Sequence, residues 1–563
     1  MNMTKSVGYI INRISLTIIC ISCFLPKVHL FTDKLTLPKF YLSILGWSVL
    51  AVSNSIVSMK PDNKDDFHTM VEFGMIAYAS AACMECLYVM HEAISLNSFS
   101  LAQSGTFDNP AGLALSICVA LPYTAWRAVS SNVAWTKAAC AITSLLFFSV
   151  IVMSGSRTGL LSAALCITCL ILHTVRSRVS MKRWMKCGAA IFAALMIVTV
   201  VTHVCVSKRD STSGRTFILQ QSLGMVKERP VFGWGKGGFE RTYMSKQADY
   251  FKGNPNSEHA VLADEVQHPL NEYVYNQVNF GIAGTLFLLA ALFVPIIASM
   301  RKKCHVSRPI VMALVSVAVF SCFSYPFHYP ASWIVVVLAW AAIISSFITD
   351  VFSPWHSSSK LGSAHLSERK RSPKCINMLK RKISCSILLS SGLAVLTATF
   401  VDAYHEYRWC TSFKQSVRGN HSDALRGYEG VYGYFSHDRY FLYSYSMAAF
   451  MASDFNRAYQ LAEECSKYWS SYNVQLLSGD ISLYRKKYDA AERHFHTASM
   501  MCPVRFAPLE GLYKVYETKG DTERMDSVAQ LINEKTVKIV SSDVSRIKDA
   551  CKGDVLNRKN QNY

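Results

Sequence analysis

The chain has 563 residues, of which 51% are hydrophobic and only 17% are charged, and its mean hydropathy of +0.19 is high for a soluble protein. The net charge of +20 would suit a nucleic-acid-binding protein, but the basic residues cluster in short segments between long apolar runs, without a nucleic-acid-binding motif. The composition excludes an ordinary soluble domain and indicates a polytopic membrane protein with no nucleic-acid partner.

Eleven apolar runs approach the roughly 20 residues that a helix needs to cross the ~30 Å hydrocarbon core of a bilayer. We therefore predict an all-α fold, a polytopic transmembrane helix bundle of about 11 spans. No small-residue cleavage site follows the first run, so we expect it to be a span and not a removed signal. The predicted spans are 8–25, 40–58, 69–90, 110–127, 133–152, 157–174, 184–205, 270–299, 309–325, 331–349 and 383–402.

The orientation follows from three strongly basic segments, 173–186, 301–308 and 360–382, which this count of spans places on one side of the membrane. Lys and Arg in short loops mark the cytoplasmic side. We therefore predict a cytoplasmic N-terminus. The segments placed outside are 91–109, 153–157, 206–268, 326–330 and everything after about residue 403.

The polar C-terminal region, 403–563, contains a repeat. Phe455, Tyr488 and Asp521 occupy matching positions and are spaced by 33 residues, close to the period of tetratricopeptide repeats. Small residues recur where paired helices must approach closely, at Ala458, Ala462, Ala491 and Ala498. We predict a membrane domain, 1–402, with a large outside loop, 206–268, followed by a tetratricopeptide-like helical repeat domain, 403–563, whose concave face suits contact with a protein or a chain.

Two arginines lie in the predicted outside loops. Arg157 stands at the outer end of a span, in SGSRTGLL (154–161), and Arg215 lies in the long loop. A guanidinium binds phosphate bidentately and keeps its charge, so the two could clamp a pyrophosphate. The alternatives are a snorkelling arginine and a solvated one. A third outside segment, SGTFDNPAGLA (104–114), is also richer in polar and glycine residues than an anchor requires.

Two other patterns favour structural interpretations. GWGKGG (233–238) does not have the spacing of a phosphate-binding loop, so we predict a tight turn that uses the conformational freedom of glycine. The chain has 18 cysteines, including three CxxC pairs inside predicted helices, but no second pair or histidine cluster stands at zinc spacing. We predict no metal site and no cofactor.

The run HPLNEYVYNQVNFGIAG (268–284) begins a predicted span with polar groups, although a membrane helix should begin apolar. Pro269 suits the first position of a helix. The polar side chains that would then share one face are His268, Asn271, Glu272, Tyr275, Asn276 and Asn279. Polar groups in membrane helices usually face the bundle or a wet cavity. We predict a cavity at the outer leaflet lined by this stripe; the alternative is that interfacial polar residues only cap and solvate the helix.

Four of these segments, in this order, resemble the O-antigen ligase and polymerase family: SGTFDNPAGLA, SGSRTG, the stretch from SGR (213–215) to ERPVFGWGKGGF (228–239), and HPLNEYVYNQVNFGIAG. The resemblance covers most of residues 100–350. It implies a metal-independent membrane glycosyltransferase in the bacterial inner membrane, with the C-terminal domain in the periplasm.

The resemblance also implies the substrates. The donor would be a glycan on undecaprenyl pyrophosphate, and the acceptor a hydroxyl on lipid A core, on another glycan or on a protein. These three acceptors correspond to a ligase, a polymerase and a protein O-oligosaccharyltransferase. Membrane lipids surround the bundle, and a protein partner could bind through residues 406–563.

Residue by residue, Arg157 and Arg215 match the two family arginines, which would hold the pyrophosphate. Asn271, Gly281 and Gly284 match the motif H[NSQ]x9GxxG, and its histidine falls on Leu270. Either His268 or Glu272 would then accept the proton of the acceptor hydroxyl, and direct displacement would invert the anomeric carbon. Asn271 and Tyr275 are the further substrate-binding candidates.

Two readings from other classes compete. A transporter of lipid-linked sugars would need charges deep in its spans and, often, inverted repeats, whereas the polar groups gather at the outer ends. A membrane-anchored scaffold, in which only the C-terminal domain acts, would need a single span.

Overall fold

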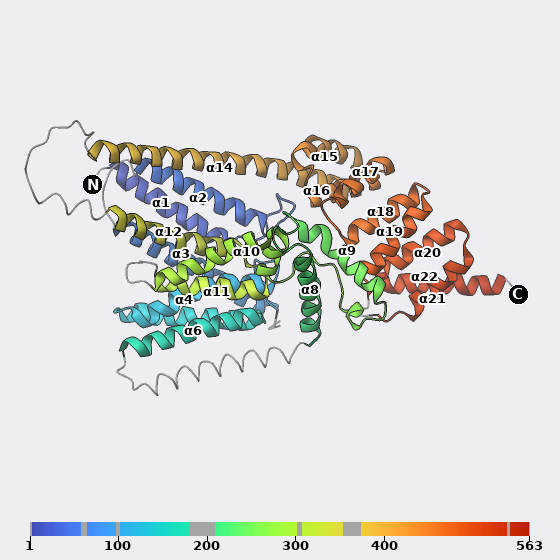
Figure 1. The fold of residues 1–563 in the computed structure, drawn as a ribbon, viewed down its shortest axis with the longest axis horizontal. Coiled ribbons are helices and arrows are strands. Elements are labelled where there is room, and N and C mark those ends of the chain that lie inside the picture. The colour runs from blue at the N-terminus through green and yellow to red at the C-terminus, as the bar shows by residue number, and fades with distance from the viewer. Residues whose placement is uncertain are drawn as a thin grey trace, which may run out of the picture. The chain divides into compact units, whose positions relative to one another are not determined.

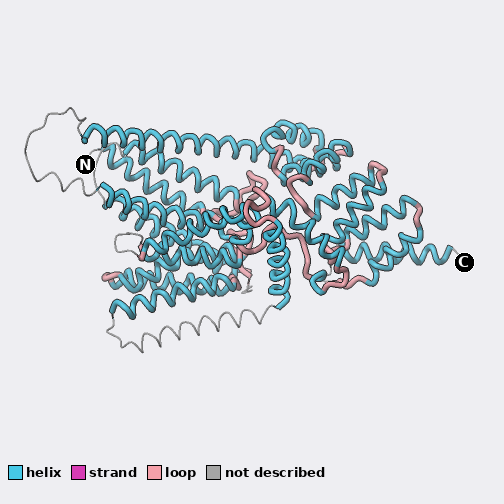
Figure 2. Tube along the Cα trace, in the orientation of Figure 1, coloured by secondary structure: helices cyan, strands magenta, loops and turns pink. Residues whose placement is uncertain are grey.

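The structure is a computed structural model that describes residues 3–57, 65–96, 102–178, 209–300, 307–352, 373–537 and 541–561. In these ranges the chain forms helices joined by loops and contains no strand, which confirms the all-α prediction (Figure 2). The chain divides into two compact units, each made of two segments. The first comprises Met1–Val206 and Phe287–Glu406, and the second comprises Ser207–Leu286 and Tyr407–Tyr563.

The first unit is a bundle of long apolar helices. They are α1 (Met3–Ser22), α2 (Leu37–Val57), α3 (Asp65–Ser95), α4 (Pro110–Ser130), α5 (Ala134–Met153), α6 (Arg157–Arg178), α11 (Arg308–Phe323), α12 (Pro330–Phe352), the short 3-10 helix η2 (Pro326–His328), the C-terminal part of α10 (Glu272–Ser299) and the larger part of α14 (Pro373–Val417). Ten of the predicted spans fall on these helices. The eleventh, 184–205, lies outside the described residues, as do most of the three basic segments on which the predicted orientation rests.

Helix α4 forms the centre of this bundle. Pro110 stands in its first turn, and Asn109 caps it by accepting a hydrogen bond from the Gly112 N–H (2.9 Å). Its residues from Gly112 to Ala125 are buried, because α3, α5, α6, α11 and α12 all pack against it. Gly112 allows a close approach, since a Cβ there would lie 2.5 Å from the ring of Tyr329.

The outer helices expose apolar side chains instead. Leu145 on α5, Phe287 on α10 and Ile387 on α14 are each more than half exposed. Five helices are long and apolar enough to cross a bilayer, and four shorter apolar helices accompany them in the described part of the chain. An apolar surface of this kind suits lipid and not water. The predicted multi-pass membrane bundle is confirmed at this level.

The second unit combines the predicted outside loop with the C-terminal region (Figure 1). Its helices are α8 (Arg209–Glu228), α9 (Gly238–Gly253), the 3-10 helix η1 (Glu258–Val261), the first turns of α10, the last turns of α14, and then α15 (His421–Phe435), α16 (Arg439–Met451), α17 (Phe455–Ser466), α18 (Tyr472–Tyr484), α19 (Tyr488–Met501), α20 (Ala507–Lys519), α21 (Thr522–Glu534) and α22 (Ser542–Gln561).

Consecutive helices from α16 to α22 pack against one another and are joined by short loops. The helices α17, α19 and α21 begin at 455, 488 and 522, so the repeat seen in the sequence is a repeat of helix starts. Asp454 and Asp521 cap two of these helices with their side chains, and Ala458 and Ala491 are fully buried between helices. The assignment to the tetratricopeptide class stays a prediction.

The predicted boundary at residue 402 falls inside a continuous helix, because α14 extends from Pro373 to Val417. Near that point two contacts within the first unit hold the helix: the Tyr41 hydroxyl donates to Asp402 (2.6 Å), and the Thr32 N–H donates to Glu406 (3.1 Å). No loop therefore separates the two predicted domains, and the division into domains 1–402 and 403–563 stays a prediction.

Helix α10 is broken at Gly281, whose φ of 63° and ψ of −156° are accessible essentially only to glycine. The break frees the carbonyls of Val278 and Asn279, and these accept hydrogen bonds from the N–H groups of Trp234 and Gly235 (both 2.8 Å). The Ile282 N–H, which has lost its helical partner, donates to the Val231 carbonyl (3.1 Å). The GWGKGG segment thus replaces the hydrogen bonds that the helix lost.

These contacts confirm the tight-turn interpretation of GWGKGG, since Gly233, Gly235 and Gly237 all have positive φ. The predicted helix start at Pro269 is wrong. Leu270 adopts a left-handed conformation (φ 55°) that stops any helix there, and α10 begins only at Glu272, capped by the Asn271 side chain, which accepts from the Val274 N–H (3.0 Å).

The substitution Gly281→Ala should destabilise the protein. A Cβ would lie 2.0 Å from the Val231 carbonyl oxygen, and the backbone conformation alone disfavours any other residue by about 1–3 kcal/mol. The measurement is the melting temperature of the purified full chain in detergent. The control is Gly224→Ala on α8, where a Cβ meets nothing within 4 Å and where alanine should stabilise the helix by up to about 1 kcal/mol. Equal melting temperatures for the two variants would contradict the proposed role of the break.

Candidate functional site

The six predicted site residues are divided between the two units. Arg157 lies in the first unit, as the first residue of α6, and its side chain is half-buried. The preceding residue caps the helix, because the Ser156 hydroxyl accepts from the Gly159 N–H (3.1 Å). Arg157 therefore stands where the partial positive charge of a helix N-terminus adds to that of its guanidinium. The other five candidates belong to the second unit.

The segment 104–114, also in the first unit, is held by buried charged groups. The Lys39 ammonium donates to the Thr106 carbonyl (2.9 Å), and the Thr106 N–H donates to the Glu85 carboxylate (2.8 Å). At the tip of the segment, the Tyr329 hydroxyl donates to Asp108 (2.7 Å). This segment is organised mainly by contacts within its own unit.

In the second unit the structure brings His268 and Glu272 together. His268 Nε2 lies 3.4 Å from Glu272 Oε2, and the two side chains are only 18% and 8% exposed. The Leu270 N–H donates to His268 Nδ1 (2.9 Å). The lone pair of Nδ1 is thereby used, so the proton of the neutral ring lies on Nε2, which faces the carboxylate. The strained backbone at Leu270 is what lets the chain fold back onto the imidazole.

Tyr275 extends this pair into a longer chain of contacts. Its ring stacks on the His268 ring, with centroids 4.6 Å apart. Its hydroxyl donates to Glu240 Oε1 (3.0 Å), and the same oxygen pairs with Arg439 Nη1 at 3.1 Å. Glu240 is the third residue of α9 and is buried. Tyr275 is thus occupied in holding the pair and Asn271 in capping the helix, so in this arrangement both serve the geometry of the site.

Arg215 lies in the first turns of α8, and it is exposed. Its neighbour Phe217 is buried, with its ring packed against those of Tyr250, Phe251 and His259 at centroid distances of 5.0–5.5 Å. Phe217 therefore anchors this part of α8, and the arginine is presented at the surface of the unit.

The C-terminal helices hold the segment that leads to His268. Arg505 pairs with Asp264 at 2.8 Å. Ser471 and Asn473 both donate hydrogen bonds to the neighbouring Glu265 carboxylate, the latter over 2.7 Å. Burial raises the pKa of the Glu265 carboxyl. Because buried carboxylates require partners of this kind, the position of residues 263–268 depends on the C-terminal region.

The predicted cavity along the polar stripe stays a prediction, and two polar side chains of this segment make contacts within the unit. Asn279 is buried, and its Oδ1 accepts from the Phe239 N–H (3.0 Å). Gln277, in the same segment, donates to the Pro230 carbonyl (2.7 Å). These two side chains thus bind the backbone on either side of the glycine-rich turn. The part of the stripe that remains available for chemistry is the end that carries His268 and Glu272.

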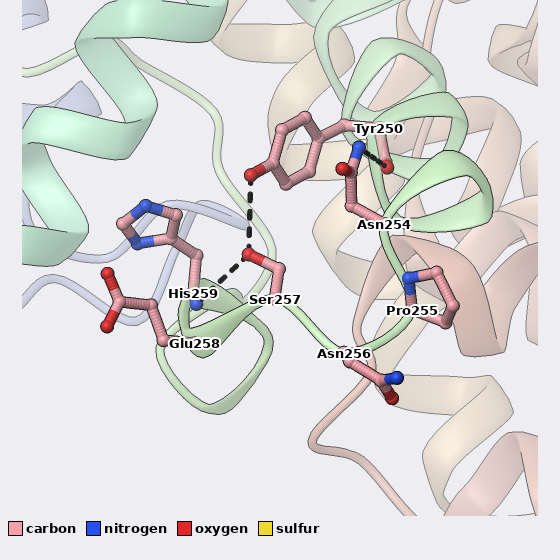
Figure 3. A pocket seen from close by; sticks show the side chains of 7 residues that line it. All are labelled: Tyr250, Asn254, Pro255, Asn256, Ser257, Glu258 and His259. Carbon is pink, nitrogen blue, oxygen red and sulfur yellow. Dashed lines mark hydrogen bonds between the residues drawn. The ribbon is translucent and has the colours of Figure 1, made fainter.

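A pocket of about 410 Å³ does lie elsewhere in this unit, around the loop between α9 and η1. Its lining residues are Tyr250, Asn254, Pro255, Asn256, Ser257, Glu258 and His259. The Tyr250 and Ser257 hydroxyls meet at 3.3 Å, whereas the Asn256 and Glu258 side chains point away from each other (Figure 3). The pocket does not include any of the six candidates. Among the described residues we also find no group of three or more metal-ligating side chains.

Residues 142–289, about a quarter of the chain, match the family model described as O-antigen ligase, and this match supports the resemblance to that family. A search of curated proteins gave no match. The matched region contains all six predicted site residues and also Glu240. The apolar helices indicate a multi-pass membrane protein, and the match supports membrane glycan transfer of the ligase or polymerase type.

The sequence analysis missed Glu240 and Arg439. Glu240 has a weak local signal, because an acidic residue in the first turn of a helix that follows a glycine turn usually stabilises the helix dipole. Arg439 has none, since it lies 199 residues from its partner. Only the fold of the unit, which brings the first residue of α16 to the first turn of α9, relates the two.

Removing the C-terminal region should abolish activity toward every acceptor and not merely change the acceptor. A chain that ends at residue 406 lacks Arg439, Arg505 and Ser471, and leaves the carboxylates of Glu240, Asp264 and Glu265 without these partners. The measurement is glycan transfer by purified protein. The control chain ends at residue 551 and so retains the buried residues Ile547 and Cys551. Transfer to any acceptor by the shorter chain would contradict this expectation.

Proposed function

We propose that this protein transfers a glycan from undecaprenyl pyrophosphate to an acceptor hydroxyl on the periplasmic side of the bacterial inner membrane, with the N-terminus in the cytoplasm and residues 403–563 in the periplasm. The observation that carries the proposal is the largely buried His268–Glu272 pair, 3.4 Å apart at the start of α10, inside the region that matches the O-antigen ligase model. A carboxylate beside a neutral imidazole is suited to accepting a proton from a hydroxyl.

Of the two candidate bases, the geometry favours Glu272. His268 Nδ1 already accepts from the backbone of Leu270, and Nε2 carries the proton of the neutral ring. The imidazole therefore has no lone pair to offer unless it leaves the Leu270 N–H. Glu272 can accept a proton with its carboxylate, while His268 holds that carboxylate in place.

The reaction is a direct displacement. The acceptor oxygen forms a bond to the anomeric carbon while the bond from that carbon to the pyrophosphate oxygen breaks, and the electron pair leaves with the pyrophosphate. The acceptor proton passes to Glu272, and the configuration inverts. Arg157 and Arg215 neutralise the charge that grows on the leaving group, which is the kind of electrostatic stabilisation that is strongest at a pre-organised site. No step calls for a metal ion or a cofactor.

The acceptor is a hydroxyl of lipid A core, of another glycan or of a protein, and the same residues serve all three reactions. The C-terminal helices, as a repeat domain, supply a surface for a bulky or protein acceptor or for a protein partner. The donor and the displacement are common to the ligase, the polymerase and the protein-glycosylating enzyme.

Arg215→Ala should lower transfer by about 100-fold or more, the usual effect of removing one such electrostatic donor. The assay supplies the purified protein with a native pool of lipid-pyrophosphate glycans and each class of acceptor, and follows transfer by mass spectrometry. The control is Arg426→Ala, which removes a positive charge from a side chain that is 82% exposed. Undiminished transfer by Arg215→Ala at normal expression would rule out this role. Transfer by the wild type to one acceptor class would identify the protein as a ligase, a polymerase or a protein-glycosylating enzyme.

Glu272→Gln should lower kcat by about 10²–10⁴-fold, as expected for loss of a general base. His268→Gln should cause a smaller loss of about tenfold, because it removes one orienting contact worth about 1–1.5 kcal/mol. The rates are measured in the same transfer assay across pH. The reverse order, with His268→Gln the more damaging, would make the histidine the base.

A further inference from the structure

Two residues at the start of α16 contact residues that neighbour or lead to His268. Arg439 and Tyr440 are the first two residues of this helix, which is capped by Asp438 through the Tyr440 and Phe441 N–H groups (both 2.9 Å). The Tyr440 hydroxyl donates to Gln267 Oε1 at 2.5 Å, directly before His268 in the chain. The capped start of α16 thus holds Tyr440 beside Gln267, the residue before His268.

A second set of contacts joins the charged side chains of Arg439 and Glu240 to Tyr275. Arg439 Nη1 lies 3.1 Å from Glu240 Oε1, and the Tyr275 hydroxyl donates to that same oxygen over 3.0 Å. The Arg439 and Glu240 side chains are 20% and 8% exposed, so solvent screens the pair far less than it would a surface pair. The Arg439 guanidinium also lies 4.8 Å from the centre of the Tyr440 ring. Its orientation is therefore restricted from two sides.

We infer that Arg439, a residue of the C-terminal region, positions the His268–Glu272 pair through Glu240 and Tyr275. This inference rests on the proposed function. Arg439 holds Glu240, Glu240 accepts from Tyr275, and the Tyr275 ring, stacked on His268, sets the plane of the imidazole that faces Glu272. The charged and titratable groups around His268 are then Glu272 and Tyr275 from α10, Glu240 from α9 and Arg439 from α16. Arg439 is a positioning residue, because its side-chain contacts are with Glu240, Tyr440 and Trp469 and not with the catalytic pair.

The same chain offers a matched control. Arg457 pairs with Glu429, and the Tyr445 hydroxyl donates to that same carboxylate (2.6 Å), so this trio repeats the arginine, glutamate and tyrosine of the site. All three of its members lie on α15, α16 and α17 of the C-terminal region. Arg457→Gln thus removes an ion pair of the same residue types, more exposed than the pair at the site (34% and 60%), from a place without candidate catalytic residues.

The test uses full-length protein with Arg439→Gln, Arg439→Lys, the double variant Glu240→Gln/Arg439→Gln, and Arg457→Gln. We expect Arg439→Gln to lower kcat by about tenfold or more while KM for the lipid-linked glycan changes by less than about threefold, since it shifts the base and not the donor-binding arginines. Arg439→Lys keeps the charge and should recover most of the loss. The double variant leaves no buried charge unpaired, so it should fold normally and still show the reduced kcat.

A second readout does not depend on catalysis. Diethyl pyrocarbonate acylates neutral imidazoles, and peptide mapping by mass spectrometry gives its rate at His268 alone. We expect this rate to rise in Arg439→Gln and in the double variant, as the stacked ring loosens, and to stay unchanged in Arg457→Gln. Wild-type kcat and an unchanged His268 rate in the folded double variant would overturn the inference, as would equal effects of Arg457→Gln. If the wild type transfers no glycan, the proposed function fails, and the modification rates still decide whether Arg439 orders His268.

Discussion

The candidate site depends on the break in α10 at Gly281 and on the glycine-rich turn (233–238), whose N–H groups bind the carbonyls that the break leaves without helical partners. Without the break, residues 272–280 would continue into the apolar part of the helix. With it, the carbonyls of Val278 and Asn279 bind the turn at 233–235, and the turn delivers the start of α9 with Glu240 beside Tyr275. The backbone conformation of Gly281, which is accessible essentially only to glycine, thus determines how α9 approaches the His268–Glu272 pair.

In this arrangement the C-terminal region supports the structure around the candidate site and is not simply a binding domain appended to the chain. Its helices supply partners for Glu240, Asp264 and Glu265, and all three carboxylates come from the part of the chain between α8 and α10. Glu240 is buried and Glu265 is partly buried, and a buried carboxylate is stable only when it is paired. The loop and the helices therefore have to fold together. A surface for an acceptor or a partner can exist on the same helices, but their first role in this fold is support.

Much of the architecture could be predicted because it follows from local patterns. Apolar runs of about 20 residues located the helices of the bundle, and the spacing of Phe455 and Tyr488 located the starts of α17 and α19. Asn271 and Gly281 were singled out by a motif, and the structure gives each a physical task, as a cap and as a break. The predicted helix start at Pro269 failed because Leu270 takes a left-handed conformation that no local preference of leucine suggests.

The sequence by itself determined the class of the protein, the helical repeat of its C-terminal region and the residue types available for chemistry, because hydrophobic periodicity, caps and turns act over a few residues. Only the tertiary structure decided which of these residues meet. The pairing of Arg439 with Glu240, the stacking of Tyr275 on His268 and the occupation of His268 Nδ1 by the Leu270 N–H depend on where whole helices and a folded-back loop come to lie. The Arg439–Glu240 pair in particular has no signature in the local sequence, since its energy arises only once distant segments bury their polar groups together.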